Sequence, residues 1–448
     1  MSGGEFRYRF TGVNTTPSTP FDDSWIRFSD RDFRDDPEAK RRNTSVGAAE
    51  QTWAQDFWRI AQAVYLADRR SRRDAAHDRW MRTIELSVQV HEPDVWKSQC
   101  ERLDRLLQLL TGDRWDISFH DGVDSPTKTR NLVDNPPTSV ALFSGGLDST
   151  AYAAYRAARL GDEERIQFVA FDPTVKARQK EIFEEVEHLV PNQKSAHSRM
   201  FLFSRRLLPV GGCLDSSNRS RSLTYIAAAV CQAAGDDISD VVVPENGQLA
   251  INPPLTSGRR SACSTRSVHP WIIDTINQLI AAVGGDISVR NPFLHATKGE
   301  VCRCAVNSGL DSEVLRRTVS CGRPTVARRD SDRAHFNCGT CFPCLVRRSG
   351  LHHALADGDD SGYAHPLASI DLAGTSRKAR RDASHLRDLI HWLNAPFTVD
   401  DLLADTPYPQ AISPQSVMPV LERGRDELRA MLADLVPHLM PPVRLPTG

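Results

Sequence analysis

The stretch with the plainest chemical meaning is Ser-Gly-Gly-Leu-Asp-Ser-Thr at residues 144–150, between an apolar run at 140–143 and an alanine-rich helical pattern. Two adjacent glycines let backbone N–H groups approach an anion closely, hydroxyls add donors, and the dipole of the following helix favours negative charge. We therefore expect a phosphate-binding turn; a plain turn capped by Asp148 is the alternative. The residues expected to contact a nucleotide are Phe143, Ser144, Gly145, Gly146, Leu147, Asp148, Ser149 and Thr150.

Four of the ten cysteines gather in one segment with the spacing C-x16-C-x2-C-x2-C, namely Cys321, Cys338, Cys341 and Cys344. Four thiolates at such spacing can surround a tetrahedral Zn²⁺ ion. The same ligands can hold an iron–sulfur cluster, and unliganded thiols are a further alternative. We expect zinc. Because four cysteines complete its coordination shell, we expect the site to be structural rather than catalytic.

The segments that position these residues change character along the chain. Residues 1–130 combine three alternating runs with two amphipathic helical patterns, which predicts an α+β module before a linker rich in Pro and Gly. Residues 136–317 alternate short apolar runs with helical patterns, so we expect an α/β domain with a doubly wound parallel sheet. A four-cysteine zinc segment at 318–350 and C-terminal helices at 366–448 follow. The runs expected to form the sheet are 140–143, 166–171, 200–203, 241–243 and 287–289.

Residues 144–150 resemble the PP-loop of the N-type ATP pyrophosphatases, which implies an ATP-binding domain of the adenine nucleotide alpha hydrolase type. The Gly-Lys-Ser/Thr of the Walker pattern is missing, which favours attack on the α-phosphate with pyrophosphate as the leaving group. With the four cysteines included, residues 138–350 resemble the QueC family of 7-cyano-7-deazaguanine synthases. The resemblance implies a carbon–nitrogen ligase that adenylates 7-carboxy-7-deazaguanine with ATP and Mg²⁺, displaces AMP with ammonia and forms a nitrile.

Two further segments resemble the same family. Residues 218–222, Asn-Arg-Ser-Arg-Ser, look like its Gly-Arg-Asn turn, and residues 297–300, Thr-Lys-Gly-Glu, look like the start of its lysine-bearing helix. The resemblance implies catalytic roles for Asp148, Arg221 and Lys298. The two basic residues are expected to neutralise charge as pyrophosphate departs.

The chain also departs from the compact family pattern. Its Tyr-Pro-Asp-Cys-Arg signature is missing, and Glu245 and Asn246 stand in that region, after the fourth predicted strand of the sheet. Open α/β sheets bind ligands at this edge, so both are candidate substrate contacts; a turn at Asn246-Gly247 is the alternative. The front module and C-terminal helices resemble the enlarged QatC proteins of Qat anti-phage defence systems. If the adenylation step is kept, an amine of a partner protein can replace ammonia as the acceptor; the extra domains, which ammonia would not need, motivate this hypothesis.

Composition narrows the class of partners. Lys+Arg 56 against Asp+Glu 57 gives a formal net charge of -1, which offers no case for a nucleic-acid partner. No apolar run approaches the roughly 18 residues of a membrane span, and residues 1–10 lack a signal-peptide pattern, so we expect a cytoplasmic protein. Two other functions fit the sequence: a PP-loop enzyme that modifies tRNA, and a nucleotide-sensing scaffold without turnover.

Overall fold

The computed structural model describes residues 5–12, 24–29, 32–34, 51–123, 136–171, 176–191, 200–204, 208–209, 214–215, 219–256, 266–322, 337–359, 361–373 and 376–439. Three features of the sequence interpretation lie outside the described residues: the centre of the linker at 124–135, Asn218, and the spacer 323–336 between the first two clustered cysteines. Among the described helices, none combines the length and the apolar character that a bilayer span requires.

The first sheet is formed by the front of the chain and has four parallel strands in the order β2-β1-β4-β5. Three of its strands were predicted, whereas β2 was not, although its four residues Ile-Arg-Phe-Ser alternate apolar with polar side chains. The prediction of an α+β module was wrong. Helices connect β2 to β4 and β4 to β5, so the strands run parallel and the module is α/β. The strands are β1 (Glu5–Thr11), β2 (Ile26–Ser29), β4 (Thr83–Gln89) and β5 (Arg114–His120).

Three helices pack on this sheet: α2 (Thr52–Arg70), α3 (Pro93–Lys97) and α4 (Cys100–Thr111). The helical pattern predicted at 95–110 is therefore divided in two. A short antiparallel pairing of β3 (Phe33–Arg34) with β9 (Leu208–Pro209) links this part of the chain to the second half.

The second sheet has five parallel strands in the order β11-β10-β6-β7-β8, and each corresponds to a predicted apolar run. The chain builds the sheet from β6 to β8 on one side and then from β10 to β11 on the other. The direction thus reverses beside β6, the position where open parallel sheets form ligand crevices at the carboxyl ends of their strands. The strands are β6 (Ser139–Leu142), β7 (Ile166–Ala170), β8 (Met200–Ser204), β10 (Asp240–Val242) and β11 (Ser288–Arg290).

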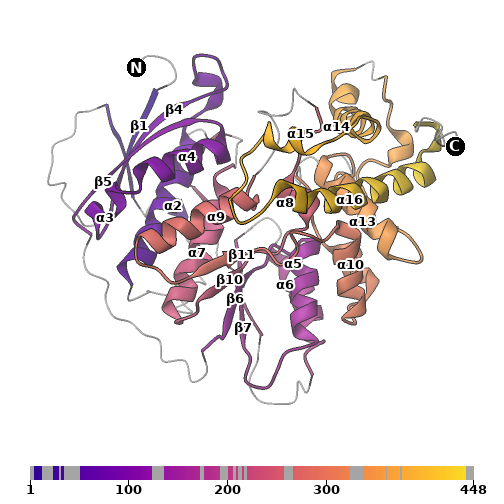
Figure 1. Ribbon diagram of the computed structural model, residues 1–448, viewed down its shortest axis with the longest axis horizontal. Coiled ribbons are helices and arrows are strands. Elements are labelled where there is room, and N and C mark those ends of the chain that lie inside the picture. The colour runs from indigo at the N-terminus through magenta and orange to yellow at the C-terminus, as the bar shows by residue number, and fades with distance from the viewer. Residues whose placement is uncertain are drawn as a thin grey trace.

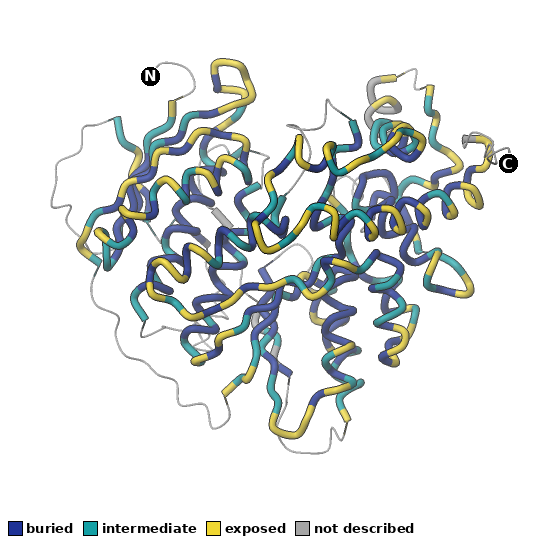
Figure 2. The backbone as a smooth tube through the Cα atoms, in the orientation of Figure 1, coloured by how far each residue is buried: buried dark blue, intermediate teal, exposed yellow. Residues whose placement is uncertain are grey.

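The inner strands of this second sheet are mostly buried (Figure 2). Val140 and Val241 belong to one apolar core, while their neighbours Ala141 and Val242 belong to another on the opposite face. Strands covered on both faces favour apolar residues on both, which is why β6, β7, β8 and β10 read as nearly continuous apolar runs; the edge strand β11 instead exposes Ser288 and Arg290. The first core includes α7 (Arg221–Gly235) and α9 (Pro270–Ala282), and the second includes α5 (Leu147–Ala157), α6 (Lys176–Glu187) and α10 (Lys298–Asn307).

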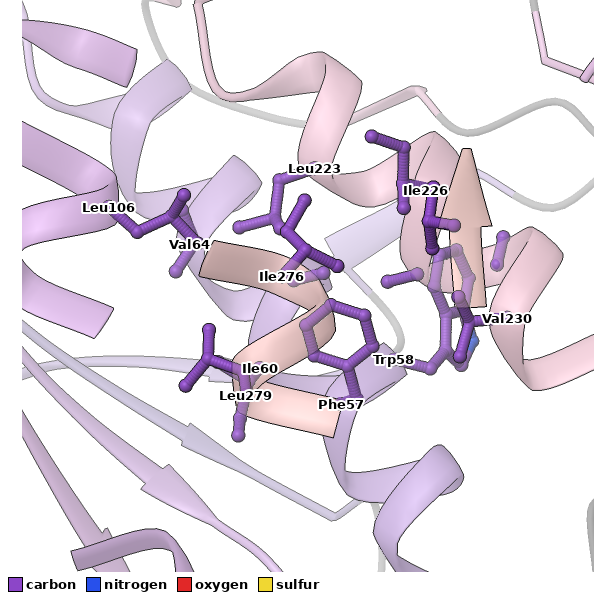
Figure 3. Close-up of a cluster of buried hydrophobic side chains, with 14 of the residues drawn as sticks. Phe57, Trp58, Ile60, Val64, Leu106, Leu223, Ile226, Val230, Ile276 and Leu279 are labelled. Atoms are coloured by element: carbon purple, nitrogen blue, oxygen red, sulfur yellow. The ribbon is translucent and has the colours of Figure 1, made fainter. Parts of the chain in front are cut away.

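The two sheets share one apolar core through the packing of α2 against α7 (Figures 1 and 3). In sequence, α2 is apolar on most of its surface, as expected for a helix enclosed between two layers. The side chains labelled in Figure 3 are Phe57, Trp58, Ile60 and Val64 of α2, Leu106 of α4, Leu223, Ile226 and Val230 of α7, and Ile276 and Leu279 of α9.

The C-terminal helices fold back over the second sheet's carboxyl end, with α16 lying along α8 (Gly247–Ile251), α10 and α13 (Figure 1). Two glycines allow this close packing. A Cβ atom at Gly424 of α16 would lie 2.4 Å from Gln248 Nε2 of α8, and one at Gly247 of α8 would lie 3.0 Å from Val420 Cγ1 of α16. The remaining helices are α11 (Ser312–Arg317), α13 (Phe342–Ala354), α14 (Arg377–Asn394), α15 (Val399–Leu403) and α16 (Pro414–Leu435).

Candidate functional site

The turn at residues 144–150 leaves the carboxyl end of β6 and enters α5, where Gly146 is the N-cap. Gly145 has φ +70°, and a Cβ atom there would lie 2.7 Å from Gln179 Cγ, so this position requires glycine. The turn is held by its own hydroxyls: the Gly146 N–H donates to Ser144 Oγ (3.1 Å), and the Ser144 N–H donates to Ser149 Oγ (3.2 Å). The predicted order of strand, turn and helix is confirmed.

Four predicted residues from three distant segments meet beside this turn. Lys298 Nζ, from the first residue of α10, donates to Asp148 Oδ2 in the first turn of α5. Asn246 Nδ2, after β10, donates to the same Asp148 oxygen (3.3 Å) and to Glu245 Oε1 (3.0 Å). Lys298 is 1% exposed and Asp148 6%, so the ion pair lies in a medium of low polarity where its interaction is strong.

Asp148, which is buried, and Glu245, which is half-buried, form a pair of acids. Burial raises the pKa of Glu245 well above its ordinary value, and the negative charge of Asp148 raises it further. A protonated Glu245 donates a hydrogen bond to Asp148, which favours the neutral form. Asp148 Oδ1 is buried and receives no N–H donor from the described residues. Such a pair can hold either a proton or a hard cation between its oxygens, so the donor set fits Mg²⁺.

Lys298 is fixed from several sides. Its backbone N–H donates to Gln248 Oε1 (2.8 Å), and a capping box between Thr297 and Glu300 begins its helix. Its side chain passes close to α13, because a Cβ atom at Gly350 would lie 2.3 Å from Lys298 Cγ. These contacts leave the ammonium group little freedom other than to face Asp148.

Two cavities open on either side of the turn. The first, of about 280 Å³, is lined by Asp148, Lys298, Asn252, Phe342 and His385 among others. The second has a volume of about 330 Å³. Its lining includes Phe143, which follows β6, Phe171, which follows β7, and Arg221 and Tyr225 of α7. Their common wall consists of Ser144, Ser149, Pro244, Glu245, Ser267, Val268, Val319, Ser320 and Cys321.

The predicted site residues are distributed unequally over these cavities. Arg221 lines the second cavity, with its guanidinium 5.6 Å from the Tyr225 ring centroid, whereas Lys298 lines the first. Gly145 and Thr150 line neither cavity, and Asn246 lies behind the wall. Asn246 Oδ1 also accepts the Leu249 N–H (3.2 Å), so this residue makes the predicted turn as well as contacting both acids.

The four predicted cysteines come together: their sulfur atoms all lie within 4.8 Å of one another, and Cys338 Sγ is 3.9 Å from Cys344 Sγ. A tetrahedral zinc ion with Zn–S distances of about 2.3 Å places its sulfurs roughly 3.8 Å apart, so the arrangement fits zinc. Gly339, with φ +86°, makes the tight turn after Cys338. The Cys341 N–H donates to Cys338 Sγ (3.4 Å), a bond that favours the thiolate form a metal requires.

Residues 318–321 connect this cluster with the turn. The Leu147 N–H donates to Ser320 Oγ (3.2 Å), and the Val319 N–H donates to the Gly145 carbonyl (3.3 Å).

Sequence reasoning did not identify Ser320, His385, Gln248 or Glu427 as parts of the site. Only the position of Ser320 next to a clustered cysteine could have drawn attention to it, because the other three come from helices without a motif.

Comparison with known proteins gives one finding for part of the chain. Residues 268–355 match the family model described as queuosine biosynthesis protein QueC. This segment holds Lys298 and the four clustered cysteines. The 144–150 turn precedes it in the chain and lies outside the match. The match supports a QueC-like protein and suggests an ATP-using reaction of that type. No curated protein matches the chain.

Proposed function

We propose that this chain is an ATP-dependent ligase of the QueC type, built on a doubly wound PP-loop domain. It adenylates a carboxylic acid and transfers the acyl group to a nitrogen nucleophile. The observation that carries the proposal is the buried ion pair of Lys298 and Asp148 with the half-buried Glu245 next to it, beside the 144–150 turn where two cavities meet. A reaction between two bound substrates needs this arrangement, because it brings their reacting atoms together.

The second cavity suits the nucleoside of ATP. Phe171 and Tyr225 stack with ring centroids 4.9 Å apart, offering a flat apolar wall to a purine, and Arg221 supplies positive charge at the same wall. The triphosphate then extends to the turn, where backbone N–H groups and hydroxyls of the 144–150 segment bind its oxygens. Mg²⁺ bound with ATP would be held by Asp148 and Glu245, and it supplies positive charge against the phosphates.

The first cavity suits the acid. A carboxylate oxygen of the acid attacks the α-phosphorus, the bond from that phosphorus to the bridging oxygen breaks, and pyrophosphate leaves. Lys298 offsets the charge that develops on the departing group. A nitrogen nucleophile then attacks the acyl carbon, loses a proton and displaces AMP. The protein contributes position and charge, and none of its side chains becomes covalently attached to the acyl group.

The QueC match favours 7-carboxy-7-deazaguanine or a relative as the acid. Leu255 and Phe342 offer apolar surface to a flat ring, and Asn252 and His385 offer polar contacts. Because α14 from the C-terminal helices contributes to this cavity, we propose an amine of a partner protein as acceptor, with ammonia as the simpler choice. A role in anti-phage defence of the Qat type, in the cytoplasm, belongs to the same proposal.

The test is release of pyrophosphate and AMP from ATP and Mg²⁺ in the presence of 7-carboxy-7-deazaguanine, with products identified by mass spectrometry. We expect release that needs the acid and is lost in Asp148→Asn. The matched control is Asp240→Asn, because Asp240 pairs with Arg290 on the exposed surface, away from both cavities. Nucleotide binding without release with any deazaguanine acid would overturn the proposal and favour a sensor. Transfer of sulfur to tRNA would favour the other PP-loop chemistry.

A further inference from the structure

We propose that residues 318–321 form the second half of the nucleotide cradle, with Ser320 Oγ donating to a phosphate oxygen, and that metal binding by the four cysteines strengthens nucleotide binding through this segment. The inference rests on the proposed function, since it requires ATP at the 144–150 turn. It adds a phosphate-contacting residue and an energetic link between two sites.

The segment closes directly over the turn. Ser320 Oγ accepts the N–H of Leu147, the first residue of α5, and the Val319 N–H donates to the Gly145 carbonyl. The fit is tight, because a Cβ atom at Gly146 would lie 3.2 Å from the Val319 carbonyl oxygen. Ser320 also lines both cavities. Its oxygen is used as an acceptor, so its O–H group remains available to a phosphate oxygen at the common wall.

The segment is held in turn by residues next to the clustered cysteines. Asn337, one residue before Cys338, grips it at two points: Asn337 Nδ2 donates to the Thr318 carbonyl (3.0 Å), and the Ser320 N–H donates to Asn337 Oδ1 (3.1 Å). Arg347 of α13 donates to Thr318 Oγ1. Thr318, Asn337 and Arg347 are buried, so the bonds between them are shielded from competing water.

Metal binding adds the cross-link that completes this support. Cys321 follows Ser320 directly, and its thiol meets those of Cys338, Cys341 and Cys344 at the start of α13. A metal that joins the four thiols therefore ties residue 321 to a buried helix, although sixteen residues separate it from Cys338. If bound metal raises the affinity of this segment for the phosphate, bound phosphate must raise the affinity of the cysteines for the metal by the same factor.

The first experiment measures binding of α,β-methylene-ATP with Mg²⁺ by titration calorimetry, using the full chain with zinc bound and after zinc is removed by a chelator. We expect zinc removal to weaken binding roughly tenfold, within the usual range of coupling between two sites. We also expect the nucleotide to slow the loss of zinc to the chelator. Cys304→Ser serves as the control, because Cys304 lies in α10 outside the cluster.

A second variant keeps the test decisive if the zinc-free chain unfolds. Ser320→Ala with zinc bound should retain its fold and its metal, with a small loss of thermal stability because the Leu147 N–H loses its acceptor, and should bind the analogue about tenfold more weakly, because it loses a hydrogen bond to a charged group. Ser308→Ala is the matched control, since Ser308 Oγ donates to the Cys304 carbonyl away from both cavities. Tight binding by Ser320→Ala, equal to that of the parent chain, would overturn the inference alone. Failure of the zinc-bound parent chain to bind the analogue would overturn the proposed function as well.

Discussion

Glu427 of α16 accepts a hydrogen bond of 3.1 Å from the backbone N–H of Gly299, the residue that follows Lys298. It also accepts the hydroxyl of Thr297, so one carboxylate holds both neighbours of the lysine. A carboxylate at the N-terminus of a helix satisfies N–H groups that have no partner within the helix and interacts favourably with its dipole. The C-terminal helices are therefore part of the support for the candidate site, although they lie outside the segment that matches QueC.

The Glu427 carboxyl should make stability depend on pH. Burial raises the pKa of Glu427 to about 6 from an ordinary value of 4.5. Because the folded chain holds this proton more tightly than the unfolded chain, the stability that this carboxyl contributes is fully present below pH 4.5 and is lost as pH rises through about 6. The difference corresponds to about 2 kcal/mol of unfolding free energy. We expect Glu427→Gln, which keeps an oxygen acceptor, to remove this part of the pH dependence in urea unfolding.

Activity provides the second measurement on the same residue. Glu427→Ala leaves the Gly299 N–H and the Thr297 hydroxyl without an acceptor, so we expect kcat to fall about tenfold. We expect Glu427→Gln to recover most of the loss at neutral pH. Equal pH dependence of stability in the Gln variant and the parent chain would contradict the buried position of this carboxyl.

Removal of the Lys298 charge should affect stability and activity by different routes. Lys298→Met keeps the length of the side chain but leaves Asp148 buried without its partner, which should cost about 3 kcal/mol in unfolding free energy. The double variant Lys298→Met with Asp148→Asn should recover most of that stability. Neither variant should release pyrophosphate at more than about a hundredth of the parent rate.

Arg290→Met is the control for this experiment. Arg290 pairs with Asp240 at the surface, where an ion pair contributes about 0–1 kcal/mol, so its loss should be nearly neutral. A Lys298→Met chain as stable as Arg290→Met would show that Lys298 and Asp148 do not form the buried pair.

Local pattern predicted much of the fold. Four strands of the second sheet were found because a strand buried on both faces is a nearly continuous apolar run, and the edge strand β11 was found from the short run at 287–289. The front module was assigned to the α+β class because alternation of apolar and polar residues shows only that a segment is a strand. Whether two neighbouring strands run parallel or antiparallel depends on the segment that connects them, which here contains helices. At 95–110 the apolar spacing continues through Ser98 and Gln99, so the break between α3 and α4 was not evident.

The candidate site was predictable only where residues belong to a motif or follow a predicted strand. Asp148, Lys298, Glu245 and Asn246 were named from motifs and strand ends, and the structure brings these four side chains together. Glu427 and Ser320 were missed because neither a helix surface nor a single serine carries a local signal. Their importance depends on which backbone N–H groups they reach after folding.

The four-cysteine site should contain zinc. We expect metal analysis of the purified chain to give about one zinc per chain, and we expect no visible absorption band, because zinc with four thiolates has none of the colour of an iron–sulfur cluster. Cys341→Ser should lose the metal and lower the melting temperature, whereas Cys304→Ser should change neither. A brown protein that contains iron would contradict the zinc assignment.

Gly350→Ala tests the close approach of α13 to Lys298. Helix propensity alone favours alanine over glycine by about 1 kcal/mol, so a position facing open space would be stabilised. Here the added Cβ would lie 2.3 Å from Lys298 Cγ, and overpacking of this kind should instead destabilise the chain by about 1–3 kcal/mol. The displaced lysine should also lower kcat more than it raises KM. For comparison, Gly161→Ala places its Cβ no closer than 3.6 Å to a neighbour, and we expect little change in either property. If Gly350→Ala proves more stable than the parent chain and equally active, the lysine stem does not pass against α13, and its alignment with Asp148 must depend on α10, Gln248 and Glu427.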